Sequence, residues 1–413
     1  MKPLSTSFAA KIGLDWADTK HDICLKPKTS DKLEYSVINH TPESIDEWAL
    51  SLQKRFKNCP IAICLELKAG PVVYALMKYE FITLFPIPPN ALAKYRKAFT
   101  QSGAKDDPTD AFLQLDYLLK HPESLRPLLP EDPETRILQR LVEDRRDFVE
   151  KKVRLTNWIT ASLKSYYPQV LQWFGDIDTQ LFCDFILQWS TLEQAQHASA
   201  ASLRQFFKAR RCVQDSVIEK RVKAIKKSMP LTTDEGVIIP FERLTTSLVR
   251  QLSQLLTTIQ EYDVDIAQRF EQHSERALFE SLPGAGAALA PRLLAAFGTN
   301  RERYASVDEL ARYSGIAPVL ERSGQKVWVH WRYSCPKFLR QTFVEWANQS
   351  KKYSYWAKEF YEGKRAAGKS HQAALRMLAF KWIRILFRCW QSRTPYDEAT
   401  YLFALKRRKT TIC

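Results

Sequence analysis

The sequence predicts an α/β domain with a mixed β-sheet at the N-terminus, followed by a helical middle region and a mostly helical C-terminal region. Two observations support this prediction. Short β-rich runs separated by polar turns open the chain, and helical and strand-like segments then alternate up to about residue 88. Beyond that point almost every periodic segment has helical spacing.

The order of the elements narrows the fold of the first domain. In chain order we expect strands over 10–17, 21–27 and 33–40, a helix over 43–56, a strand over 61–67, a helix over 70–80, a strand over 81–88, and then two helical stretches. A strand meander followed by alternating helix and strand is typical of an α/β sheet. This order is that of the ribonuclease-H-like fold, although other α/β folds share its early part.

Long helices are predicted in the middle of the chain. Charged residues four apart support one helix over 134–165, and the chain stays mostly helical from 166 to 232. From 241 to 266, apolar residues recur in alternating steps of four and three, which is the heptad pattern of a coiled coil. A coiled coil would leave an apolar seam exposed on this helix, so we expect a second copy of the chain to cover it. One amphipathic helix packed on its own domain explains the pattern equally well.

Four regions follow from these patterns. We expect a first domain at 1–165, a helical and coiled-coil region at 166–275, a C-terminal domain at 276–395 and a basic tail at 396–413. The tail carries KRRK at 406–409, which predicts a disordered arm that seeks phosphate groups.

Composition excludes several classes of protein. The 413 residues are 45% hydrophobic and 26% charged, as in an ordinary globular protein. No apolar run reaches the roughly 18 residues of a transmembrane helix, and we expect no cleaved signal peptide and no membrane partner. The eight cysteines are scattered without a CxxC pair, which argues against a disulfide framework and a zinc site. We therefore expect a cytoplasmic protein with reduced thiols.

The distribution of charge indicates a polyanionic partner. The net charge is +16, and residues 276–413 hold 25 Lys and Arg against 10 Asp and Glu. The first 275 residues hold the other 37 and 36, so the excess belongs almost wholly to the C-terminal third. A basic region of this kind attracts nucleic acid.

Four acidic residues form a candidate magnesium site. Asp15 interrupts the apolar first strand, Glu66 closes a buried strand, and Asp107 and Asp110 lie three apart at a helix start. Carboxylates brought together from two strands and a helix can hold Mg²⁺ ions that activate a nucleophile at phosphate. Helix capping alone also explains Asp107 and Asp110, and strand ends or surface positions explain the other two.

Two further motifs lie in the basic C-terminal third. Gly284 and Gly286 fall between two short helical pieces, as in a helix-hairpin-helix that grips a DNA phosphate, although a glycine turn between packed helices has the same pattern. Ser323 lies in a loop among the cations Arg322, Lys326 and Arg332. A serine in that setting can attack a phosphodiester, but a Ser-Gly turn is usually only a turn.

These residues resemble a known family, the DEDD transposases of bacterial insertion sequences (the family numbered one-ten). The likeness rests on six ordered blocks, which are GLDWADTKHDICL, LELKAGPVVYAL, GAKDDPTDA, LPGAGAALAPRLLAAFG, LARYSGIAPVLERSGQK and FLRQTF. It spans residues 11 to about 395. The run Glu66-Leu67-Lys68-Ala69-Gly70 departs from the Glu-x-Thr-Gly of many members, and the acidic tetrad and the serine are retained.

The resemblance implies a RuvC-like N-terminal domain that binds Mg²⁺ and a C-terminal transposase domain with a catalytic serine. The family tetrad falls on Asp15, Glu66, Asp107 and Asp110, and its serine on Ser323. Family members recombine donor and target DNA through a serine–DNA link and are directed by a bridge RNA. For this chain we therefore expect DNA, a bridge RNA and a second copy of the chain, in a dimer or tetramer, as partners, and association with the bacterial nucleoid.

Two other functions stay open at the level of sequence. A RuvC-like, Mg²⁺-dependent nuclease could cut branched DNA by water attack, with Ser323 structural. A nucleic-acid-binding protein without catalysis would use the acids only as helix caps and strand ends. A covalent protein–DNA adduct distinguishes the transposase from the nuclease, and Mg²⁺-dependent cleavage of DNA excludes the binding protein.

Overall fold

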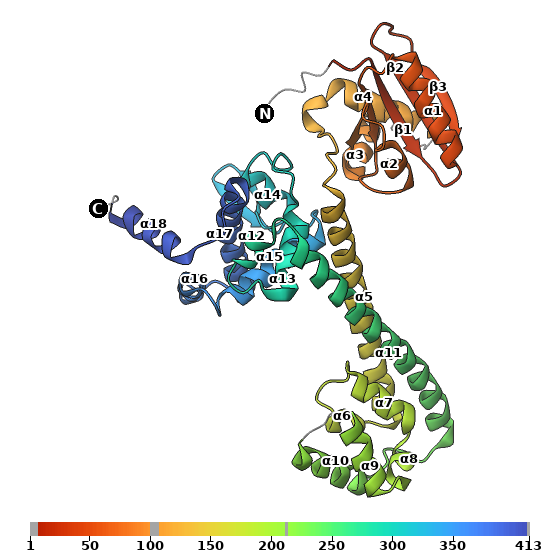
Figure 1. Ribbon diagram of the computed structural model, residues 1–413, viewed down its shortest axis with the longest axis vertical. Helices are drawn as coiled ribbons and strands as arrows, with labels where there is room; N and C mark the ends of the chain where they lie inside the picture. Colours follow the sequence, from red (N-terminus) through yellow and green to blue (C-terminus); the bar gives the residue numbers. More distant parts are fainter. Residues whose placement is uncertain (1–6, 100–106, 211–213, 411–413) are drawn as a thin grey trace. The chain divides into compact units, whose positions relative to one another are not determined.

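The computed structural model describes residues 7–99, 107–210 and 214–410, with side chains for all of these except 107 and 408–410 (Figure 1). The chain forms two compact units, which meet between Pro130 and Glu131. The predicted first domain ended later, at residue 165. In the described residues no helix is long and apolar enough to cross a membrane.

A five-stranded mixed sheet forms the core of the first unit. Its strands are β1 (Ala10–Trp16), β2 (Lys20–Pro27), β3 (Glu34–Asn39), β4 (Ile61–Leu65) and β5 (Ile82–Pro86). They lie in the order β3-β2-β1-β4-β5, with β1, β2 and β3 antiparallel and β1, β4 and β5 parallel. The mixed α/β sheet expected from the sequence is therefore confirmed, and its strands lie where they were predicted along the chain.

Helices cover this sheet. They are α1 (Pro42–Arg55), α2 (Pro71–Leu76), α3 (Pro89–Phe99), α4 (Asp107–Lys120) and the short 3-10 turn η1 (Pro122–Ser124). Helix α4 packs directly on β1 at Gly13, where a Cβ atom would lie 1.9 Å from the carbonyl oxygen of Ala111. Only glycine allows this approach, so Gly13 sets how closely α4 lies against the sheet.

Two long antiparallel helices run through the second unit. Helix α5 (Pro133–Tyr166) pairs with α11 (Glu235–Gln272), and a 2.7 Å hydrogen bond joins the hydroxyls of Ser162 and Thr245. Leu248, Leu252 and other residues of the α11 heptads are buried within the same chain. The expectation of an exposed seam that a second copy must cover is therefore wrong, because α5 and the neighbouring short helices already cover it.

Five short helices pack around the end of α5 and the beginning of α11. They are α6 (Val170–Trp173), α7 (Gln180–Gln188), α8 (Leu192–His197), α9 (Ala200–Ala209) and α10 (Asp215–Lys227). Their shared core is rich in aromatic rings, and Phe185 contacts the rings of Trp173, Phe174 and Phe206. This region is mostly helical, as predicted.

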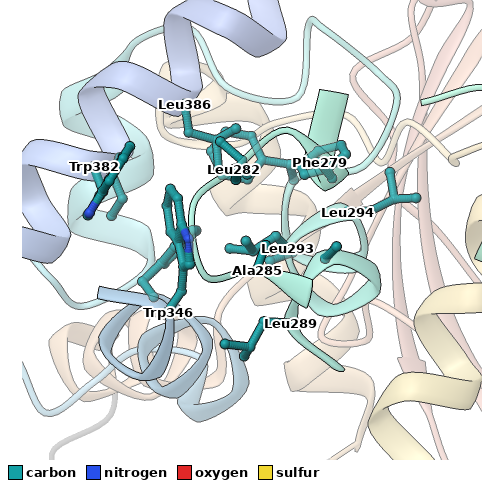
Figure 2. Close-up of a cluster of buried hydrophobic side chains, with 14 of the residues drawn as sticks. Phe279, Leu282, Ala285, Leu289, Leu293, Leu294, Trp346, Trp382 and Leu386 are labelled. Atoms are coloured by element: carbon teal, nitrogen blue, oxygen red, sulfur yellow. The ribbon is translucent and has the colours of Figure 1, made fainter. Parts of the chain in front are cut away.

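The C-terminal part packs on the opposite ends of α5 and α11. Its elements are α12 (Arg276–Glu280), α13 (Gly286–Phe297), α14 (Val307–Tyr313), β6 (Val319–Ser323), β7 (Lys326–His330), α15 (Lys337–Ser350), α16 (Tyr355–Ala366), α17 (His371–Ser392) and α18 (Glu398–Thr410). Figure 2 shows Trp346 and Trp382 beside Leu282 and Leu293 in its core. Both buried indoles donate hydrogen bonds, to the Pro283 carbonyl and the Ser350 hydroxyl. The basic tail forms helix α18 as far as Thr410, so the expected disordered arm is wrong.

Candidate active site

Two of the predicted acids lie at the carboxyl ends of neighbouring strands of the first sheet. Asp15 lies on β1, two residues after Gly13, so its side chain projects on the face that α4 covers. Strands β1 and β4 are parallel and pair Gly13 with Cys64. This pair is the last of the register, and Asp15 and Glu66, the first residue after β4, each follow it by two residues. The register therefore favours the approach of these two carboxylates that the sequence predicted.

Helix α4 brings a third acid to the same face of the sheet. Asp110 is only 2% exposed, and the Arg96 guanidinium on α3 lies 2.7 Å from its carboxylate. One turn later on α4, the fully buried Gln114 donates a 3.2 Å hydrogen bond from Nε2 to Asp15 Oδ1. Asp110 and Gln114 are four residues apart and so share one helix face. The amide of Gln114 therefore links the helix that carries Asp110 to the strand that carries Asp15.

The negative charge of Glu66 affects the buried Cys64 thiol of the sheet. Burial, and secondarily the Glu66 carboxylate, raise the pKa of the Cys64 thiol to about 12. Cys64 is on the face of β4 that packs against α4. The thiol therefore stays protonated and uncharged next to the acidic site, and Glu66 is the nearby anion.

The described residues fit a magnesium site in chemistry but do not form one in geometry. Among them, no group of three or more His, Cys, Asp and Glu side chains is close enough to hold one metal ion. Helix α4 begins at Asp107, as the sequence predicted, but the Asp107 side chain lies outside the described residues. The available donors are oxygen atoms, the ligands that Mg²⁺ prefers. One of them, Gln114 Oε1, is buried and has no hydrogen-bond partner in the described part of the chain.

Ser323 lies at the end of a two-stranded hairpin. Strands β6 and β7 are antiparallel, and the two residues between them are Gly324, with φ +57°, and Gln325. Glycine with positive φ at the first position is typical of a tight hairpin turn. Ser323 pairs with Lys326 in this register, and all residues from Glu321 to His330 are exposed. The serine is thus reachable and has an ammonium group beside it.

The other two predicted cations are not placed as expected. Arg322 precedes Ser323 on the same strand, and successive side chains of a strand point to opposite faces, so Arg322 projects away from the serine. Arg332 lies beyond the hairpin, where its Nε donates a 3.3 Å hydrogen bond to the Ala317 carbonyl. Of the three cations, Lys326 is the one that shares the Ser323 face.

The base of the hairpin carries a cation cluster that the sequence patterns did not single out. Two guanidinium groups lie over the Trp331 ring, that of Arg340 at 5.0 Å and that of Arg376 at 3.9 Å from the ring centroid. Burial and the charge of Arg340 lower the pKa of Arg376. Within the described ranges neither arginine has a carboxylate partner. Two unneutralised arginines on one ring are a ready site for phosphate.

The predicted helix-hairpin-helix has the expected local form. Helices α12 and α13 are joined by a turn with positive φ at Gly284 and at Gly286. A Cβ atom on Gly284 would lie 2.8 Å from the backbone of Gln349, so this glycine serves the packing of α15 against the turn. Gly286 is exposed, with nothing near a Cβ position, at the start of the 12-residue helix α13. Of these two glycines, Gly286 is the exposed one.

Comparison with known proteins identifies the family. A model of transposases of the DEDD type, named for insertion element IS110, matches residues 12–168. A second model, for transposases of the IS116/IS110/IS902 family, matches residues 276–362. The chain belongs to the IS110 family of transposases. The two matches cover the acidic sheet and the Ser323 hairpin respectively.

Individual relatives support the assignment of this transposase to the IS110 family. A Streptomyces coelicolor protein described as the mini-circle transposase for IS117 is 27% identical over 95% of this chain and 96% of its own length. A 43.6 kDa protein of insertion element IS110 from the same species is 24% identical over 71% and 73%. The 42 kDa protein of insertion element IS900 from Mycobacterium paratuberculosis is 30% identical over 40% and 42%.

Sequence reasoning missed three residues that the geometry of the transposase brings forward. Gln114 is four residues after Asp110, and this helical spacing could have placed it beside the acids. Arg340 and Arg376 come from α15 and α17 and meet only on Trp331. A contact between residues 36 positions apart leaves no periodic signal in one sequence.

Proposed function

We propose that this transposase cuts and rejoins donor and target DNA through a covalent link between Ser323 and a DNA phosphate. The observation that carries the proposal is the placement of Ser323 on an exposed hairpin, paired with Lys326, inside the segment that matches the transposase family. An exposed hydroxyl can reach the backbone of a bound duplex, and an adjacent ammonium offsets the charge that builds on phosphate.

In the proposed serine chemistry, the energy of the cleaved DNA phosphodiester is kept in a new phosphodiester bond to the serine. Ser323 Oγ forms a bond to phosphorus, the bond from phosphorus to the leaving strand oxygen breaks, and a base takes the serine proton and returns it to that oxygen. In the second step a hydroxyl of the other DNA attacks the serine phosphodiester and restores the serine. No oxidant or nucleotide is needed, because one phosphodiester replaces another in each step.

Within the same proposal, Asp15, Glu66, Asp107 and Asp110 hold Mg²⁺, which would supply a Lewis acid at a phosphate oxygen. The oxygen donors and the unpartnered Gln114 Oε1 support this part. Arg96 now neutralises Asp110, and its guanidinium would have to share or yield that carboxylate when a cation binds. Gln114 would orient Asp15 by its hydrogen bond.

The proposed partners beyond DNA are a bridge RNA and further copies of the chain. The basic C-terminal third, with Gly286 and the arginines on Trp331, supports phosphate binding. An oligomer no longer follows from the α11 seam. The proposed reaction favours an oligomer instead, because recombination of two DNA molecules uses two sets of strand-cutting groups. A dimer or tetramer therefore stays the expected state.

The deciding experiment uses a labelled DNA substrate that carries the element ends, quenched in detergent. Wild type should yield a protein–DNA adduct that survives denaturation, and Ser323→Ala should yield none while still binding DNA. Ser334→Ala, at another exposed serine of this region, is the matched control and should retain the adduct. An adduct of equal amount with Ser323→Ala would assign the chemistry to another residue.

The runner-up function is a Mg²⁺-dependent nuclease that uses water. Its distinguishing result is strand cleavage in wild type with no adduct, together with unchanged cleavage by Ser323→Ala. The buried Asp110 on α4 and the Asp15 carboxylate that accepts from Gln114 are the features that this reading shares with the transposase. Asp110→Asn should reduce cleavage under both readings, so only the adduct separates them.

A further inference from the structure

Helices α9 and α10 carry a concentration of positive charge outside the regions discussed so far. Residues 200–230 hold nine Lys and Arg against two Asp and Glu. The first 275 residues taken together are nearly neutral, so averaging over that length hides the local excess. This part of the chain lies outside both segments that match the family.

Most of these cations have structural partners. Five of them bind carboxylates or backbone carbonyls, in the pairs Arg204 with Glu219, Lys208 with Asp215, Arg210 with Asp184, Arg221 with the Trp173 carbonyl and Lys226 with the Ala198 carbonyl. Arg211 lies outside the described residues. These contacts hold α9 and α10 against the neighbouring helices, so five of the cations have a structural role.

Three lysines are left without such a role. Lys220, Lys223 and Lys227 are exposed, and none has an ion pair or a side-chain hydrogen bond within the described part of the chain. Their spacing of three and four residues places them on one face of α10. Like charges so spaced destabilise a helix. The helix dipole favours cations only in the last turn, which accounts for Lys227 but not for the other two.

The lysine face borders a hollow of about 540 Å³. It is lined by Arg204, Glu219, Lys220, Val222, Lys223 and Lys226. Four of these six residues are cations, and Val222, the only aliphatic one, is nearly buried. A protein partner would need an apolar patch at the centre of its interface, and the described residues that line the hollow offer none. A polyanion needs only the charge.

We propose that this α9–α10 surface, with Lys220, Lys223 and Lys227 at its centre, binds the phosphate backbone of duplex DNA. Lys220 and Lys227 are about 10 Å apart along the helix axis. Backbone phosphates of one strand recur about every 3.4 Å along the duplex axis, so the three lysines can span about three phosphates. The choice of DNA rests on the proposed function, in which the transposase binds donor and target DNA. The surface would position DNA without reading its sequence.

The test compares salt dependence of DNA binding by the full chain. The probe is a fluorescent 30-base-pair duplex of arbitrary sequence, with anisotropy measured between about 50 and 200 mM salt. Each phosphate contact contributes about 0.9 to the slope of log K against log salt. The K220Q/K223Q/K227Q variant should therefore lose about 2.7 from the wild-type slope. These exposed substitutions should leave thermal unfolding unchanged.

Two control variants carry the same number of changes. K220R/K223R/K227R keeps the charge and should keep the wild-type slope. K32Q/K54Q/K57Q removes three exposed lysines from the first unit and should also keep it. A triple glutamine variant with the wild-type slope overturns the proposal.

A second arm uses the RNA transcribed from the flank of the element. If the K220Q/K223Q/K227Q variant has a reduced salt slope with this RNA but the wild-type slope with duplex DNA, the surface binds RNA and the DNA assignment is overturned. The outcome is independent of the Ser323 chemistry. The slope is measured without cleavage, and absence of an adduct in wild type would refute the proposed function while leaving the slope comparison intact.

Discussion

Replacing Gln114 with leucine should separate metal binding from the stability of the first unit. Its amide donates to Asp15, and its Oε1 is buried without a partner in the described residues. A buried polar atom without a partner costs about 1–3 kcal/mol, and a hydrogen bond contributes about 0.5–1.5 kcal/mol. Leucine has nearly the same volume and removes both. In a metal chelator the variant should therefore range from about 0.5 kcal/mol less stable to about 2.5 kcal/mol more stable than wild type.

Magnesium should stabilise the Gln114→Leu variant less than it stabilises wild type. A ligand at one hundred times its Kd stabilises the folded state by about 2.7 kcal/mol. Removing a residue that orients a metal ligand typically weakens metal affinity about 10- to 100-fold. At the same Mg²⁺ concentration the gain of the Gln114→Leu variant should then fall to between about 1.4 and 0.4 kcal/mol.

The measurement is hydrogen exchange at the amides of α4 in the full chain, in chelator and across a Mg²⁺ titration. Exchange reports the first unit directly, whereas a single melting temperature of a two-unit chain does not. Asp15→Asn serves as the variant without a metal response. Loss of more than about 1 kcal/mol in chelator, or a Mg²⁺ increment equal to that of wild type, would refute the role of Gln114. A wild type without any Mg²⁺ response would instead refute the metal site.

Three other substitutions test the packing around the site and the long helices. Gly13→Ala places a methyl group 1.9 Å from the Ala111 oxygen and should destabilise the first unit by about 1–3 kcal/mol, seen as faster exchange of β1 and α4 amides. His21 is buried against His40, and burial, then the charge of His40, lower its pKa to about 4. The unfolded state therefore binds more protons than the folded state between pH 6.5 and 4. The free energy of unfolding falls by up to about 3 kcal/mol as the pH drops through that window. His21→Gln should flatten this pH dependence, measured by urea titrations. Leu252→Ala should cost about 2–5 kcal/mol with no change in mass by light scattering, because Leu252 is buried inside its own chain, and a lowered oligomeric state would contradict this.

Local periodicity was sufficient to predict the first sheet. Strands over 10–17 and 61–67 agree with β1 and β4 to within two residues at their ends, because apolar runs bounded by turns carry the information within a few positions. The start of α4 at Asp107 was predictable for the same reason, since Asp-Pro is a local signal.

The partners of long elements were not predictable in this way. The α11 heptads identify an apolar stripe, but nothing within residues 241–266 states that α5, about a hundred residues earlier, covers it. The strand face of Arg322 relative to Ser323 was not predicted, for a different reason. Nearness in sequence was taken as nearness in space, whereas in a strand the next residue faces the other way.

The hairpin that carries Ser323 cannot by itself protect the proposed adduct from hydrolysis. A two-stranded hairpin with both faces in water is marginally stable on its own, and every residue from Glu321 to His330 is exposed. In the free chain water therefore reaches the serine as easily as DNA does. A serine phosphodiester that persists long enough for strand transfer requires the bound nucleic acid itself to cover this face. Trp328, 45% exposed on the Ser323 side, provides the surface on which a base or sugar can pack. Trp328→Ala should accordingly increase hydrolysis of the adduct relative to rejoining. The rate at which the adduct forms should change less. An unchanged ratio of hydrolysed to rejoined product would show that another part of the complex excludes water.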